Sequence, residues 1–189
     1  RCAIFRFTFP ESDSSFILID GYNRGSMVKI IPAERKVIGY CRNNRGGVPA
    51  NFHNYFVAVF DKDFSFTHTW NGNKLNLNDP EEECGHVGAV LGFKTTKGEK
   101  INVRVASSFI SHDQALLNLE NETGKKDFEE ICAEAKTAWN AQLNRIRVEG
   151  GTNDEIRTFY SCLYHTLLFP RKFFELNEKN EIVHYSPYN

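Results

Sequence analysis

The 189-residue chain is 41% hydrophobic and 25% charged with a formal net charge of −1, the balance of an ordinary globular protein. Its basic residues are scattered, which gives no electrostatic case for nucleic acid or an anionic membrane. No apolar run approaches the ~20 residues of a membrane-spanning helix.

The first 109 residues predict short strands. Phe5, Phe7 and Phe9 stand at alternate positions of Arg1–Phe9, the pattern of a half-buried strand. Asn71-Gly72 follows a later apolar run and is typical of a tight hairpin. The further predicted strands are Phe16–Asp20, Met27–Ile31, Lys36–Cys41, Tyr55–Asp61, Phe64–Trp70, Lys74–Leu77, Val87–Phe93 and Ile101–Ser107. Short strands separated by turns indicate an antiparallel sandwich.

From Ser111 onward the apolar period becomes helical. Pairs of capping residues stand three apart at 111/114, 127/130 and 152/155, as at helix N-termini. They predict helices over 112–121, 127–146 and 153–168. Apolar residues nearly surround the third helix, so it should be buried in something larger than this chain. The predicted outcome is self-association through that helix, which light scattering measures.

Cysteines and acidic residues point to no metal site. The five cysteines form no Cys-x-x-Cys pair, which argues against zinc and a dense disulfide framework. We expect them to be small buried apolar side chains. Glu81, Glu82 and Glu83 are adjacent, and we interpret them as a solvated loop in preference to a cation site.

A search for known catalytic motifs finds no nucleophile elbow, phosphate-binding loop or His-Glu-x-x-His, so the sequence assigns no catalytic residue and no metal ligand. One loop, residues 41–53, is rich in planar hydrogen-bonding groups. Its candidate contact residues are Arg42, Asn44, Arg45, Asn51 and His53. Two interpretations stay open: the loop binds sugar hydroxyls, or it is a long hairpin connection that packs on a neighbouring domain.

Three stretches together resemble glycoside hydrolase family 92, the calcium-dependent exo-acting α-mannosidases. They keep the family's order along essentially the whole chain. The stretches are Arg6–Pro10 with Phe16–Asp20, Gly39–Pro49 with Tyr55–Ala58, and Val148–Thr152 with Arg157–Arg171.

The resemblance implies an α+β architecture that agrees with the predicted elements. Residues 1–110 would form an antiparallel, supersandwich-like β-sandwich, incomplete at its start, and residues 111–150 would be linker helices. Residues 151–189 would begin a truncated (α/α)6 catalytic barrel, with the third helix as its first helix.

The resemblance also implies an activity, the inverting hydrolysis of terminal α-mannosides, expected to be α-1,2-linked. A glutamic acid would protonate the leaving oxygen, an aspartate would activate water, and calcium would bind mannose hydroxyls. These groups are expected beyond Asn189, so this chain alone should be inactive and hold no calcium. Its partners would be mannose-containing glycans and the missing catalytic domain, in the periplasm, outside the cell or on the outer surface. The alternative is a non-catalytic carbohydrate-binding or assembly module.

Overall fold

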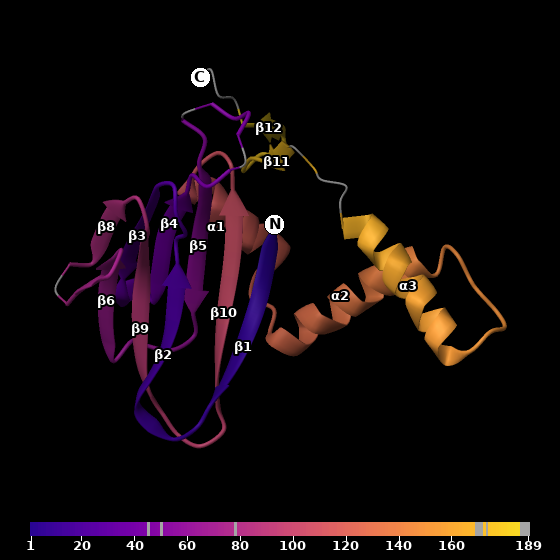
Figure 1. Ribbon diagram of the computed structural model, residues 1–189, viewed down its shortest axis with the longest axis horizontal. Coiled ribbons are helices and arrows are strands. Elements are labelled where there is room, and N and C mark those ends of the chain that lie inside the picture. The colour runs from indigo at the N-terminus through magenta and orange to yellow at the C-terminus, as the bar shows by residue number, and fades with distance from the viewer. Residues whose placement is uncertain (45, 50, 78, 169–171, 173, 186–189) are drawn as a thin grey trace. The chain divides into compact units, whose positions relative to one another are not determined.

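The computed structural model describes residues 1–44, 46–49, 51–77, 79–168, 172 and 174–185. The chain divides into two compact units, Arg1–Lys125 with Phe174–Asn189, and Lys126–Phe173. The first unit contains the β-sandwich and the second contains two helices (Figure 1).

Two antiparallel sheets form the sandwich, as the sequence predicts. The larger sheet has the strand order β1-β10-β5-β4-β3-β8 and the smaller sheet has the order β2-β9-β6-β7. The strands of the larger sheet are β1 Cys2–Phe9, β10 Glu99–Ser108, β5 Asn54–Phe60, β4 Lys36–Cys41, β3 Ser26–Ile31 and β8 Glu81–Cys84. Those of the smaller sheet are β2 Ser12–Asp20, β9 Val87–Thr95, β6 Phe66–Asn71 and β7 Lys74–Asn76.

The core lies between the two sheets and consists of aliphatic and aromatic side chains. Successive side chains of a strand point to opposite faces, so every second residue of the central strands enters it. The buried core cluster is Val28, Ile30, Val37, Ala58, Phe60, Val87, Ala89, Leu91, Phe93, Ile101 and Val103. The alternation seen in the sequence therefore marks the inner face.

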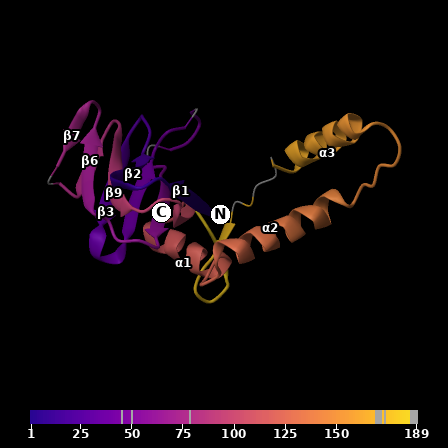
Figure 2. The same ribbon diagram turned by 90° about the horizontal axis from the view of Figure 1, so that it is seen from below.

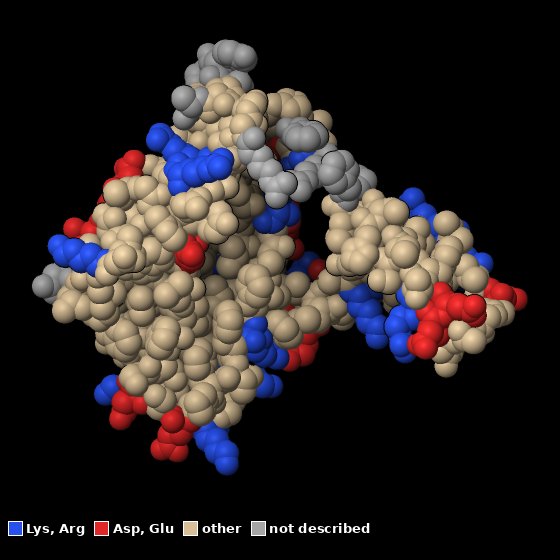
Figure 3. All heavy atoms as spheres, viewed as in Figure 1, with Lys and Arg blue, Asp and Glu red and all other residues tan. Residues whose placement is uncertain are grey.

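The outer face of the smaller sheet is aromatic. Phe16 on β2 and Phe66 on β6 both stand opposite Gly92 of the central strand β9. A Cβ at Gly92 would lie 2.1 Å from the Phe66 ring, so glycine is what lets this ring lie across the strand. Phe16 is 56% exposed. Figure 3 shows that few charged side chains lie over β2 and β9 on this face.

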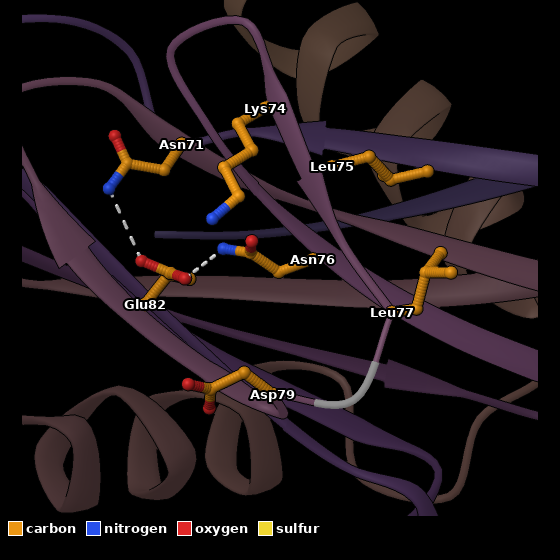
Figure 4. A pocket seen from close by; sticks show the side chains of 7 residues that line it. All are labelled: Asn71, Lys74, Leu75, Asn76, Leu77, Asp79 and Glu82. Atoms are coloured by element: carbon orange, nitrogen blue, oxygen red, sulfur yellow. Dashed lines mark hydrogen bonds between the residues drawn. The ribbon is translucent and has the colours of Figure 1, made fainter.

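One acidic segment contradicts the loop predicted for it. Glu81–Cys84 is the edge strand β8, and Glu82 stands opposite the buried Val28. Its carboxylate therefore points between the sheets, where it accepts hydrogen bonds from the side-chain amides of Asn71 and Asn76 (Figure 4). An inward-pointing charge on an edge strand protects the open edge from pairing with another chain. Three consecutive glutamates conceal this alternation in the sequence.

The prediction that the cysteines are buried is also wrong. Cys84, Cys132 and Cys162 are exposed, and Cys2 and Cys41 are half-buried. Cys84 lies on the edge strand, and the other two exposed thiols lie on helices that have no buried residue.

The first helix, α1 (His112–Glu122), packs against β10 and β5 of the larger sheet. Ser111 caps it by accepting a hydrogen bond from the backbone N–H of Gln114 at 3.0 Å. Ala115 and Leu119 are its buried apolar residues. The predicted helix is thus confirmed, and α1 covers part of the sheet's outer face.

The second unit consists of α2 (Phe128–Leu143) and α3 (Asn153–Leu168), and residues 144–152 connect them and reverse the chain direction (Figure 2). Asp127 and Glu130 form a reciprocal capping box at the start of α2. Trp139 and Tyr164 bring the two helices together with ring centroids 4.6 Å apart. The predicted helices are confirmed, although α2 ends three residues early.

Neither α2 nor α3 has a buried residue. Leu168 is 48% exposed, and the apolar side chains around α3 are only partly covered by α2. Self-association through α3 stays a prediction. Within the described residues, no helix is long and apolar enough to cross a membrane.

Candidate functional site

The loop of residues 41–53 lies at one end of the sandwich, close to a hairpin that the sequence does not predict (Figure 1). This hairpin consists of β11 (Phe174–Leu176) and β12 (Ile182–His184). Strands of three residues are too short for an alternating pattern to reveal. The hairpin belongs to the same unit as the sandwich although α2 and α3 precede it in the chain.

The predicted contact residues of the loop separate into different environments. Asn51 and His53 line a pocket. Asn44 instead stabilises the loop, because its side chain donates to the Arg42 carbonyl oxygen and accepts from the Gly46 N–H. Arg42 is exposed and is not a lining residue, but its Nε donates to His53. Arg45 lies outside the described residues.

His53 is held in one tautomer by its neighbours. The Arg42 Nε–H donates to His53 Nε2 at 3.0 Å, so that nitrogen is an acceptor. Nδ1 then carries the proton and donates to the Asn51 carbonyl oxygen at 2.6 Å. The ring stacks on Tyr55 with a centroid distance of 5.3 Å and meets the edge of Tyr40 at 4.4 Å. The imidazole is thus held in a fixed orientation by two hydrogen bonds and two ring contacts.

Tyr40 anchors this aromatic cluster to the sheet. Its hydroxyl donates to the Glu83 carboxylate, and Arg42 lies 5.8 Å from its ring centroid. Burial, followed by the hydrogen bond and charge of Glu83, raises the pKa of Tyr40 to about 12. The phenol therefore stays protonated and remains a donor throughout the neutral pH range.

His112, the first residue of α1, completes the cluster from the other side. Its ring meets the edge of Tyr55 at a centroid distance of 4.9 Å, and its Nε2 lies 3.0 Å from the Gly39 carbonyl oxygen. Burial lowers the pKa of His112 below 6.5, and the charge of His53 acts in the same direction. The hydrogen bond to Gly39 and the charge of Asp113 oppose this shift without cancelling it.

Protonation of His112 should make stability pH-dependent. Its pKa is lower in the folded state than in the unfolded state, so the unfolded chain binds the extra proton first. Stability is then fully present above pH 6.5 and declines as the pH falls below it. We expect His112→Gln to lose less stability than wild type in urea unfolding between about pH 7.5 and 5. His184→Gln, which changes an exposed histidine, should keep the wild-type pH dependence. Equal slopes for all three proteins would contradict the prediction.

The pocket beside the cluster has a volume of about 410 Å³, within the range of small-molecule sites. Its lining residues are Asn51, His53, Tyr55, Phe109, Ile110, His184 and Tyr185. Sequence reasoning found two of them. Of the others, Tyr55 lies on β5 directly after the loop. The remaining four follow β10 or come from β12 and the residue after it, and nothing in the sequence places these segments beside the loop.

A buried carboxylate fixes the hairpin to the sandwich. Glu175 on β11 is 3% exposed. It accepts hydrogen bonds from the Ser108 hydroxyl and the Phe109 N–H, both at 3.0 Å, and from Asn118 Nδ2 at 2.7 Å. Gln114 also donates to the Leu176 carbonyl oxygen at 2.7 Å. The hairpin that supplies one wall of the pocket is therefore held at a defined place.

The described residues contain no group of three or more His, Cys, Asp and Glu side chains that could hold a metal ion. These residues therefore provide no ligand cluster for the calcium that the family resemblance implies.

Comparison with known proteins covers the full length of the chain. Residues 1–108 match the glycosyl hydrolase family 92 N-terminal domain, and residues 114–189 match the family 92 catalytic domain. A secreted glycosidase of Arthroderma benhamiae, described as uncharacterized, is 33% identical over 92 residues, which are 46% of this chain and 12% of that protein.

Two solved structures are similar to the whole fold. An inverting mannosidase of family GH92 from Bacteroides thetaiotaomicron is 43% identical with a TM-score of 0.93, over 100% of this chain and 26% of that one. A family GH92 α-mannosidase of the same organism is 25% identical with a TM-score of 0.78, over 98% of this chain and 27% of that one. The chain thus spans about a quarter of the length of these enzymes. Because the N-terminal domain alone accounts for more than half of its residues, the chain belongs to glycoside hydrolase family 92.

Proposed function

We propose that this chain is part of an α-mannosidase that removes terminal mannose from glycans with inversion of configuration. The observation that carries the proposal is the similarity to an inverting mannosidase over every residue of the chain, at 43% identity and a TM-score of 0.93. Both the sandwich and the helical unit are included in that similarity, so it extends beyond a shared accessory domain.

An inverting glycosidase needs two carboxyl groups about 6.5–9.5 Å apart, one acting as an acid and one as a base toward water. We propose that both lie in the part of the enzyme outside this chain, and that calcium is bound there too. Calcium would supply a Lewis acid for sugar hydroxyls. This chain would then contribute the sandwich and the start of the helical domain. The secreted glycosidase among its relatives supports an exported location for the enzyme.

Assays with an aryl α-mannoside and calcium test this function. The full-length protein should hydrolyse the substrate and release β-mannose first, which proton NMR distinguishes from α-mannose. The 189-residue chain alone should show no turnover above the blank, because the proton-transfer groups contribute much of the rate.

Two outcomes would contradict the proposal. Turnover by the carefully purified 189-residue chain would place catalytic groups within it. An inactive full-length protein, tested with α-1,2-, α-1,3- and α-1,6-linked mannobiose, would favour the non-catalytic binding module instead. The preference for α-1,2 linkages remains a prediction that the same panel measures.

A further inference from the structure

We propose that the smaller sheet continues past β2 with a further strand, which pairs with the free edge of β2 and covers Phe5 and Phe7 of β1. The strand belongs to the enzyme's own polypeptide, in the part that lies outside this chain, and carries apolar side chains at alternate positions. This pairing does not depend on the mannosidase activity. It makes Phe5 and Phe7 core residues of the whole enzyme.

Phe5 and Phe7 face the inner side of the larger sheet at its border strand, β1 (Figure 1). Phe5 stands opposite Val103 and Phe7 opposite Ile101 on β10, and directly opposite residues of a strand pair point to the same face of a sheet. Val103 and Ile101 are core residues, 4% and 0% exposed, whereas Phe5 and Phe7 are 48% and 39% exposed. The inner face of the larger sheet therefore extends beyond its cover at β1.

The missing cover lies on the side of the smaller sheet that ends in β2. The strand β6 lies against β8, and β9 lies against β3, so the two sheets run across the sandwich in the same order. Among the described residues the larger sheet has six strands and the smaller sheet has four. The smaller sheet therefore ends at β2 before it reaches β1, and one more strand beside β2 would lie toward Phe5 and Phe7.

The outer backbone edge of β2 is open to such a strand. In the described part of the chain its strand partner is β9 alone. Gly21, directly after β2, donates its N–H to the Val87 carbonyl oxygen at 2.9 Å, and in an antiparallel pair such bonded positions alternate with positions that face away. Counting back from Gly21, the N–H and C=O groups of Leu18 and Phe16 face the free edge. These groups can pair with another strand without a change in β2.

The opposite side of the sandwich ends in strands that resist pairing. There β7 has three residues and β8 has four, and Glu82 of β8 directs its charge between the sheets. Short edge strands and inward-pointing charges both block edge-to-edge pairing. In contrast, β2 has nine residues, and its residues 15–19 are Ser-Phe-Ile-Leu-Ile, without a charge or a proline. The sandwich is therefore closed to a further strand at β7 and β8 and open to one at β2.

The length of a related enzyme indicates the source of the added strand. The inverting mannosidase matches 100% of this chain with 26% of its own length, which leaves a large part of such an enzyme to supply an extended segment. A segment of the same polypeptide pairs at a high effective concentration, whereas a second copy must associate from solution. The stacked rings of Phe5 and Phe7, with centroids 6.3 Å apart, give that segment one joint apolar surface. Its inward-facing side chains should therefore be apolar.

Hydrogen exchange resolved to single amides by mass spectrometry tests the pairing. In the 189-residue chain the N–H groups of Phe16 and Leu18 should exchange quickly, because water reaches the free edge. In the full-length enzyme they should exchange at least about 100-fold more slowly, as amides in internal strand pairs do. The N–H groups of Ile17 and Ile19, which face β9, are the control and should be protected in both proteins.

The cover over Phe7 predicts a variant whose effect depends on the rest of the enzyme. Phe7→Ala should lower the thermal midpoint of the full-length enzyme by several degrees, because it leaves a cavity at a buried site. In the 189-residue chain the same change removes a ring that is 39% exposed and should lower the midpoint clearly less. Leu75→Ala, at an exposed position of β7, should have the same small effect in both proteins. Circular dichroism establishes that each protein is folded.

Fast exchange at Phe16 and Leu18 in the folded full-length enzyme overturns the proposal. Protection that already appears in the 189-residue chain and grows with its concentration also overturns it, because the partner is then a second copy. Equal losses for Phe7→Ala in both proteins show that the ring stays uncovered and have the same consequence. Slow exchange confined to the full-length enzyme supports the added strand. An enzyme with protected β2 amides that cleaves no mannoside keeps the added strand and loses the mannosidase function, and an active enzyme with open β2 amides does the reverse.

Discussion

Replacing Glu175 by alanine should lower the free energy of unfolding by about 3 kcal/mol, because it takes the acceptor from two buried donors and one part-buried donor, at about 1–3 kcal/mol for each buried one. Those donors are the Ser108 hydroxyl, the Phe109 N–H and the Asn118 amide. Urea unfolding followed by tryptophan fluorescence measures the change.

Two further variants define the cause of this loss. Glu175→Gln keeps one acceptor oxygen but turns an amide N–H toward a donor, so its loss should be intermediate. Glu178→Ala, an exposed glutamate in the same hairpin, should change stability by no more than about 0.5 kcal/mol. Equal effects of Glu175→Ala and Glu178→Ala would show that the buried carboxylate does not hold the hairpin.

Gly39→Ala should be destabilising by about 3 kcal/mol, the upper end of the range for overpacking a core. A Cβ at Gly39 would lie 2.4 Å from the Met27 carbonyl oxygen and 2.5 Å from the Phe56 ring. The ring could rotate away, but the carbonyl belongs to the neighbouring strand β3, so the two strands would have to separate. The Gly39 carbonyl oxygen, which contacts His112, would move with them.

Gly85→Ala is the matched control, because a Cβ there meets nothing within 4 Å. Thermal unfolding followed by circular dichroism compares the two. Gly39→Ala should melt several degrees below wild type, while Gly85→Ala should melt close to it. If both variants melt together, the close approach at Gly39 does not restrict the residue.

The elements that could be predicted are those whose own sequence carries a complete signal. The helix α2 has a capping box at Asp127 and Glu130 and a regular apolar step, so its start is correct to one residue. Strands such as β3 bury every second residue, which fixes both their type and their inner face. Neither signal depends on residues elsewhere in the chain.

The features that could not be predicted depend on contacts between segments that are distant in the sequence. The sequence alone indicates that Glu82 is solvated. Only its pairing with Val28 of β3 shows that its side chain points inward. Phe109 and Tyr185 acquire a shared role only because the chain returns to the sandwich after α3. The 41–53 loop was recognisable from its composition, but composition could not separate Asn44, which stabilises the loop, from Asn51, which faces the pocket.

The sandwich unit is interrupted in sequence, since Lys126–Phe173 belongs to the other unit, and this has a consequence for biosynthesis. A ribosome that adds about 5–20 residues per second finishes Asn118 several seconds before Glu175. The apolar core can condense in that interval, because all of its cluster precedes residue 104. The Ser108 and Asn118 donors must meanwhile remain hydrated. The pocket walls at His184 and Tyr185 arrive later still, so the pocket forms only after the nascent polypeptide has folded back on its own beginning.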